Sequence, residues 1–132
     1  MLDSGPLVLV VEDDVATRAL LAAVANRCFC RVKTAGDGEM AMALIRAECP
    51  DAMVLDVFLP KVDGLTVLRH IRDTVPDLLD RTIVITAAPE LALNRAGDAH
   101  LVRNFLRKPL DLNEVMDELY RCTAMARERT AQ

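Results

Sequence analysis

Four short apolar segments of this chain each lead into a polar side chain that could take part in phosphoryl chemistry. An acidic pair, Glu12 and Asp13, follows the first segment, and Asp56 ends the second. Thr86 ends the third segment, and Lys108 follows the fourth. If these segments are parallel strands of one sheet, their carboxyl ends meet at one edge, and so do these side chains. The set would suit a divalent cation beside an aspartate that accepts a phosphoryl group.

The charges of these residues indicate which cation and which reaction to expect. The acidic pair and Asp56 would repel one another in a partly buried crevice unless a cation lay between them. Ligands that are all oxygen favour Mg2+. Asp56 could then attack phosphorus as a carboxylate nucleophile and form an aspartyl phosphate. Lys108 could pair with one phosphoryl oxygen, and the Thr86 hydroxyl could donate to another.

Each of these side chains also allows a purely structural interpretation. Asp56 could cap the loop after its strand. The acidic pair could favour the N-terminus of the following helix, which is the role we expect for Asp14. The Thr86 hydroxyl could be a cap, and Lys108 could be a solvated surface lysine. The residue types alone leave these alternatives open.

Apolar runs alternate with helix-like runs along the chain. The predicted strands span residues 7–11, 31–34, 52–56, 82–86 and about 103–107. The run at 31–34 alternates in polarity and predicts a half-exposed edge strand. Five strands that alternate with five helices predict an α/β fold, a three-layer αβα sandwich with a five-stranded parallel sheet. In such a sheet the functional crevice lies outside the carboxyl ends of the strands.

Aspartates precede three of the predicted helices and are expected to cap them. Asp14, Asp37 and Asp111 precede the first, second and last helices, and the last begins with a capping-box pattern. The first and third helices are expected to end near Arg27 and Thr74. Residues near helical spacing in the first helix are Ala16, Leu20, Ala23, Val24 and Arg27. The inward or core-facing residues are expected to be Met40, Ala41, Leu44 and Ile45 in the second helix and Leu65, Val67, Leu68 and Ile71 in the third. The last helix has an apolar stripe of Leu112, Val115, Met116, Leu119, Tyr120 and Thr123, which is expected to face inward.

Length and composition bound the remaining possibilities. The chain has 132 residues, 52% of them hydrophobic and 27% charged, which predicts a single globular domain over 1–132 with its core at about 7–125. A net charge of -4 and the lack of a basic stripe argue against direct binding of nucleic acid or an anionic membrane. No segment reads as a signal peptide or reaches membrane-spanning length, so a cytoplasmic location is expected.

The cysteines and histidines carry little functional signal. Without a secretory signal, the cysteines are expected to be reduced thiols that act as small buried hydrophobic side chains. Metal binding or redox chemistry is the alternative. His70 and His100 are isolated and are expected on helix or loop surfaces. The four cysteines are Cys28, Cys30, Cys49 and Cys122.

The motifs taken together resemble the receiver domain of bacterial two-component response regulators, including the chemotaxis regulator. The segments that carry the resemblance are "LVLVVEDD", "DAMVLDVFLPKVDGL", "IVITA" and "NFLRKPLDL", and it extends over about residues 7 to 125. The resemblance implies a flavodoxin-like sheet with strand order 2-1-3-4-5. It also implies a phosphoprotein of a phosphorelay that is phosphorylated and dephosphorylated but is not otherwise an enzyme.

The resemblance assigns roles to individual residues. Asp56 matches the phosphoacceptor, and Lys108 matches the lysine that pairs with phosphate. Asp13 matches a direct ligand of Mg2+, Glu12 an acidic position that acts through water, and Phe58 the residue whose backbone carbonyl binds the metal. The phosphoryl donor would be a sensor histidine kinase or a phosphotransfer protein.

The resemblance also implies a conformational switch. Thr86 matches the switch hydroxyl that would move toward the phosphoryl group, and Phe105 matches the aromatic residue that would turn inward. The face formed by the fourth helix, fifth strand and fifth helix would then change for a downstream effector or output domain. Phe105 lacks the hydroxyl of the tyrosine often found at this position, so burial alone would drive the switch. Phe105 could instead be a core aromatic that never moves.

Two departures from the family pattern have consequences. Phe58 and Ala88 stand where side chains flank the path of the hydrolytic water, and neither side chain can bind a water, which predicts a long-lived aspartyl phosphate. The stretch from Pro89 to Arg103 lacks the usual small turn before the fifth strand. Pro89 can begin the fourth helix, but Gly97 comes early and could end it there.

Three other functions remain as alternatives. The first is a pseudo-receiver, a protein-interaction module that is never phosphorylated, and the complete set of acids, hydroxyl and lysine argues against it. The second is a phosphatase of the haloacid dehalogenase type, which would need an acid where Phe58 stands. The third is a flavodoxin-like flavin binder, whose phosphate the acidic first loop would repel.

Overall fold

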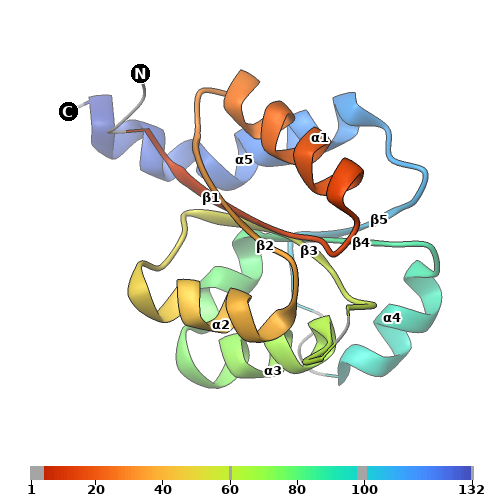
Figure 1. Ribbon diagram of the computed structural model, residues 1–132. Helices are drawn as coiled ribbons and strands as arrows, with labels where there is room; N and C mark the ends of the chain where they lie inside the picture. Colours follow the sequence, from red (N-terminus) through yellow and green to blue (C-terminus); the bar gives the residue numbers. More distant parts are fainter. Residues whose placement is uncertain (1–4, 60, 98–100, 132) are drawn as a thin grey trace.

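Five parallel strands form one sheet, in the order β2-β1-β3-β4-β5, with helices on both faces. The computed structural model describes residues 5–59, 61–97 and 101–131. Figure 1 shows α1 and α5 on one face of the sheet and α2, α3 and α4 on the other. The strands are β1 (Leu7–Val11), β2 (Arg31–Ala35), β3 (Ala52–Asp56), β4 (Thr82–Thr86) and β5 (Asn104–Arg107). The helices are α1 (Val15–Arg27), α2 (Gly38–Ala47), α3 (Gly64–Thr74), the 3-10 helix η1 (Pro76–Arg81), α4 (Pro89–Ala96) and α5 (Leu112–Ala131).

The sandwich and the strand order implied by the resemblance are confirmed. The strands predicted at 7–11, 52–56 and 82–86 have the observed bounds. The strand predicted at 31–34 extends one residue further, to Ala35, and β5 begins one residue later than expected. Strand β2 is the half-exposed edge strand that its alternating pattern indicated. The order of the strands reverses between β1 and β3, which places the switch-point crevice at the carboxyl ends of these two neighbours.

Side-chain caps fix where the helices begin. Asp14, Asp37 and Asp63 each accept a hydrogen bond from the backbone N–H three residues later, at 2.8, 2.8 and 3.0 Å. Asp111 accepts two such bonds from the first turn of α5. The three predicted caps are confirmed, and Asp63 is a fourth cap that was not predicted. Each cap of this kind contributes about 1 kcal/mol.

The inward face of α3 agrees with the prediction, and that of α5 agrees except at Tyr120, whereas the helical spacing in α1 identifies a buried residue only at Val24. Leu20 is 46% exposed, Ala16, Ala23 and Arg27 are exposed as well, and Leu21 is buried to 1%. Apolar residues occur all round α1, so their spacing does not define one face, and the packing against α5 and the sheet selects Leu21, Val24 and Ala25. Met40 in α2 and Tyr120 in α5, both predicted inward, are also exposed.

The segment between α3 and β5 holds one predicted feature and one unexpected element. Helix α4 begins at Pro89 and ends at Ala96, and Gly97 follows with a φ of +59°, as the early glycine indicated. The 3-10 helix η1 was not predicted from the sequence, and it buries Leu78 and Leu79. Residues 98–100, which include His100, lie outside the described part of the chain.

The cysteines agree with their predicted role except at one position. Cys28, Cys30 and Cys122 are buried free thiols, and burial raises the pKa of Cys122 to about 12. Cys49 is exposed at the end of α2, which contradicts the expectation that it would be a buried side chain. Its position just before Pro50, where the chain leaves the helix, places it on the surface.

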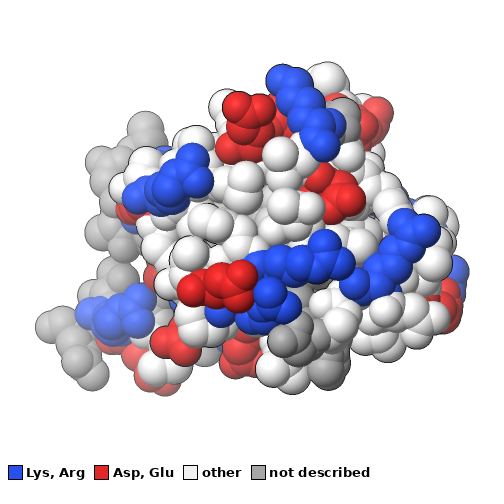
Figure 2. Space-filling model, turned by 90° about the horizontal axis from the view of Figure 1, so that it is seen from below, with Lys and Arg blue, Asp and Glu red and all other residues white. Residues whose placement is uncertain are grey.

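Figure 2 shows basic and acidic side chains in separate small groups on the face that carries α2, α3 and α4. Within the ranges that the structure describes, none of the helices is both long and apolar enough to span a bilayer.

The adjacent leucines of α1 provide a test of which face of this helix is buried. We expect Leu21→Ala to lower the free energy of unfolding by about 2–5 kcal/mol, because it opens a cavity in the core. Leu20→Ala removes an exposed side chain and should change it by less than about 1 kcal/mol. Urea unfolding of both variants measures the difference, and equal losses would contradict the observed packing of α1.

Candidate functional site

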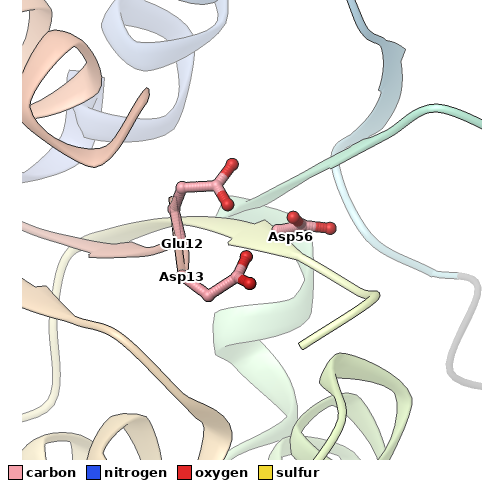
Figure 3. A group of neighbouring side chains, drawn as sticks. All are labelled: Glu12, Asp13 and Asp56. Atoms are coloured by element: carbon pink, nitrogen blue, oxygen red, sulfur yellow. The ribbon is translucent and has the colours of Figure 1, made fainter. Parts of the chain in front are cut away.

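Three carboxylates meet at the carboxyl ends of β1 and β3. Glu12 and Asp13 follow β1, and Asp56 ends β3, the strand paired directly with β1. One oxygen from each carboxylate lies within 4.8 Å of the others. Figure 3 shows the side chains of Glu12 and Asp13 reaching from the end of β1 toward Asp56. Glu12 is fully buried and Asp56 is 5% exposed, whereas Asp13 is open to solvent.

Lys108 neutralises part of this charge. Its Nζ lies 2.6 Å from Glu12 Oε1 and 3.0 Å from Asp56 Oδ2. Lys108 is placed by the turn after β5, where its N–H donates to the Thr86 carbonyl at 2.9 Å and the Lys108–Pro109 peptide bond is cis. Burial by itself lowers the pKa of Lys108, but the hydrogen bonds and charges of Glu12 and Asp56 outweigh it and raise the pKa above its ordinary value. The alternative of a solvated surface lysine at this position is contradicted by the observed ion pairs.

Backbone donors fix both buried carboxylates. Asp56 Oδ1 accepts a hydrogen bond from the Phe58 N–H at 3.0 Å. Glu12 Oε2 accepts one from the Asp14 N–H at 3.2 Å. Each buried carboxylate therefore has one oxygen on Lys108 and the other on a backbone amide. Such pairing is what allows charged groups to be buried.

The donor set fits a magnesium ion. All three side chains offer carboxylate oxygens, which Mg2+ prefers, and Asp13 leaves the group accessible from solvent. Three carboxylates against one ammonium leave a negative site, which a divalent cation would balance. The three side chains that were predicted to bind the metal, those of Glu12, Asp13 and Asp56, thus lie together. The Phe58 carbonyl, the fourth predicted ligand, belongs to the loop directly after Asp56.

Thr86 and Phe105 lie on the other side of the crevice. Thr86 is fully buried at the end of β4, and its hydroxyl accepts a hydrogen bond from the Ala88 N–H at 3.1 Å. Phe105 is half-buried in β5, where it pairs with Val84 of β4 and packs against the core under α2, α3 and α4. The hydroxyl therefore closes a local turn before α4 rather than capping it, since the N-terminus of α4 has no side-chain cap. Movement of either residue stays a prediction.

Two arginines near the crevice were not found from the sequence. Arg107 forms an ion pair with Glu90 in the first turn of α4 and contacts the Ala87 carbonyl, so it joins the end of β5 to the start of α4. Arg18 donates to the Glu12 backbone carbonyl at 3.1 Å. Arg18 lies four residues after Asp14, on the side of α1 that faces the acidic turn, and this helical spacing is the one signal that could have pointed to it.

The sequence model of the response regulator receiver domain matches residues 8–120. The chain belongs to this family. The response regulator MprA of Mycolicibacterium vanbaalenii is 38% identical over 123 residues, which cover 93% of this chain and 51% of that protein. MprA of Mycobacterium ulcerans is 38% identical over 109 residues, or 83% of this chain and 46% of that protein. This receiver domain thus spans about half the length of the curated relatives it matches.

Solved structures of other receiver domains superpose on this one. The receiver domain of a sensor histidine kinase from Pseudomonas aeruginosa, with a magnesium ion coordinated in its active site cleft, matches with a TM-score of 0.80 at 26% identity. That alignment covers 91% of this chain and 98% of the other. The non-phosphorylated HemR receiver domain of Leptospira biflexa matches with a TM-score of 0.77 at 28% identity, over 89% and 93% of the two chains. The family assignment argues against the phosphatase and flavin-binding alternatives.

The ion pairs of Lys108 predict how this receiver domain responds to loss of the ammonium. Lys108→Met should lower the free energy of unfolding by about 1–3 kcal/mol without divalent cations, because Glu12 and Asp56 would stay buried without their common partner. The matched control is Lys61→Met, since Lys61 is largely exposed and lies 3.5 Å from Asp37, and it should cost less than about 1 kcal/mol. Urea unfolding at low salt compares them, and an unchanged stability of Lys108→Met would mean that the buried carboxylates do not depend on it.

Proposed function

We propose that this receiver domain accepts a phosphoryl group on Asp56 in the presence of Mg2+ and relays that change to a partner. The observation that supports this most directly is the ammonium of Lys108 between two buried carboxylates, with the exposed Asp13 beside them. A purely structural ion pair would need one acid, whereas this site gathers three. We treat residues 1–132 as one receiver domain.

The residues of the site have distinct parts in the proposed transfer. Asp13, Asp56 and the Phe58 carbonyl would hold Mg2+, with Glu12 acting through water, and the metal charge would offset the repulsion between Asp56 and an anionic phosphate. An Asp56 oxygen would attack phosphorus while the bond from phosphorus to the donor nitrogen breaks and its electrons stay on that nitrogen. Lys108 would exchange its contact with Asp56 for one with a phosphoryl oxygen.

The proposed switch couples this chemistry to the opposite side of the crevice. Phosphorylation adds about two negative charges and three acceptor oxygens beside Asp56. Thr86 would turn its hydroxyl from the Ala88 N–H toward a phosphoryl oxygen, and the ring of Phe105 would enter the space it leaves. Because Phe105 has no hydroxyl, burial of its ring alone would drive the inward movement. The face of α4, β5 and α5 would change in shape.

The partners follow from the family rather than from a bound molecule. A sensor histidine kinase or a phosphotransfer protein would supply the phosphoryl group, and a downstream effector or an output domain would respond to the altered face. The receiver domain would bind neither nucleic acid nor a membrane directly, would have no catalytic activity beyond its own phosphorylation and dephosphorylation, and would act in the cytoplasm.

Intact mass tests the proposed phosphorylation. After incubation with Mg2+ and acetyl phosphate, we expect one phosphoryl group on the wild type and none on Asp56→Asn, which keeps the side-chain shape but removes the nucleophile. Omitting Mg2+ should prevent the addition. A wild type that binds Mg2+ and still gains no mass would favour the pseudo-receiver, a binding module that is never phosphorylated.

The neighbours of Asp56 predict how long the phosphoryl group persists. Phe58 is 42% exposed beside the site and cannot orient a water, so the aspartyl phosphate should be long-lived. Phe58→Asn would supply a hydrogen bond of about 1 kcal/mol to the attacking water, which corresponds to a roughly fivefold faster loss. The control is Phe29→Asn, at a remote residue that is 60% exposed. Rapid loss from the wild type that Phe58→Asn leaves unchanged would refute this part of the proposal.

A further inference from the structure

The backbone of Glu12 is held from two sides. Its N–H donates to the Ala35 carbonyl at the end of β2 at 3.0 Å. Its carbonyl accepts a hydrogen bond from Arg18 Nη1 at 3.1 Å. Arg18 is half-buried in the second turn of α1, and the proposed phosphoryl chemistry gives its guanidinium no part.

The contact with Arg18 bears on Asp13 rather than on the Glu12 side chain. The Glu12 carbonyl belongs to the planar peptide unit that leads into Asp13, so a bond to that oxygen sets the direction in which Asp13 leaves the strand. Glu12 and Asp56 are also fixed through their carboxylates. In the described ranges, no hydrogen bond or ion pair holds the Asp13 carboxylate, so its backbone has to orient it.

The surroundings of Arg18 fit this task. The Asp14 side chain caps α1 by accepting from the Thr17 N–H, and the Arg18 N–H donates to the Asp14 carbonyl at 2.9 Å. The start of α1 therefore fixes the backbone position of Arg18. Gly36, directly after β2, leaves room for the guanidinium. A Cβ at Gly36 would lie 3.1 Å from Arg18 Nη1, and this is the one non-neighbouring contact within 4 Å.

We infer that Arg18 is a positioning residue for the magnesium site, because its guanidinium holds the Glu12 carbonyl and thereby directs Asp13 toward Glu12 and Asp56. This inference rests on the proposed function, since it takes the three carboxylates as the site of Mg2+. A cation near the site would by itself disfavour Mg2+. Positioning and charge therefore predict opposite effects when Arg18 is replaced, which makes the two separable.

The test is a magnesium titration by calorimetry on the unphosphorylated protein. Calorimetry suits this chain because it has no tryptophan whose emission could report binding. Arg18→Met keeps the aliphatic part of the side chain and removes the hydrogen-bond donors. Arg18→Lys keeps the positive charge but lacks the planar guanidinium group. Arg27→Met is the matched control, because Arg27 is exposed at the far end of the same helix.

We expect Arg18→Met to bind Mg2+ about fivefold more weakly, a smaller loss than the roughly 10–100-fold seen when a group that hydrogen-bonds directly to a metal ligand is removed. Arg18→Lys should fall between this variant and the wild type, and Arg27→Met should match the wild type. Saturating Mg2+ should restore the extent of phosphorylation in both Arg18 variants. The thermal unfolding midpoint without Mg2+ should stay close to that of the wild type.

Gly36→Ala tests the same contact without altering Arg18, and it serves if Arg18→Met does not fold. The added methyl group would displace the end of the guanidinium and should weaken Mg2+ binding by a smaller factor, about twofold. Unchanged or tighter binding in both Arg18→Met and Gly36→Ala would overturn the inference while leaving the proposed function intact. A loss of affinity that tracks a loss of stability would also overturn it. A wild type that binds no Mg2+ would overturn the proposed function itself.

Discussion

The interaction on which the site depends is the bridge from the Lys108 ammonium to two carboxylates that the fold has removed from water. Glu12 and Lys108 are 96 residues apart in the sequence and 2.6 Å apart in space. Burial of two like charges side by side is unfavourable unless a cation and hydrogen-bond donors compensate both. The sheet order meets this requirement, because β1 and β3 are neighbours and the turn after β5 reaches across them. Charge balance at this edge therefore depends on where β1, β3 and the turn after β5 lie.

The two sides of the crevice are built differently. On the side of β1 and β3, the backbone of Glu12 is fixed by Ala35 and Arg18, and the carboxylates of Glu12 and Asp56 are fixed by amides. On the side of β4 and β5, an exposed ion pair joins Arg107 to Glu90, and exposed pairs of this kind contribute little to stability. A change of charge at Asp56 would act on Lys108, whose N–H is bonded to the Thr86 carbonyl. The side held by these backbone and carboxylate contacts is therefore the one that carries the three carboxylates.

The elements were more predictable than the faces they bury. The central strands are uninterrupted apolar runs, and three of the helix caps are aspartates with a local pattern, so both features were visible in the sequence. Helix α1 was not, because Leu20 and Leu21 are the same residue type and only contact with α5 and the sheet decides between them. Cys49 was misjudged for a similar reason, since its burial depends on where the chain turns after α2. The 3-10 helix η1 has a weak local signal and depends on burial of Leu78 and Leu79.

The sequence by itself determined the alternation of strands and helices and the residues at the carboxyl ends of the strands. It therefore also determined which residues make up the acidic site. These features repeat over two to four residues or follow directly from where a strand ends, so local physical chemistry is enough to specify them. Tertiary structure alone decided that Lys108 contacts Glu12 as well as Asp56 and that Arg18 holds the Glu12 carbonyl. Such contacts depend on distances of a few tenths of an ångström, and only the packing of the helices on the sheet fixes them.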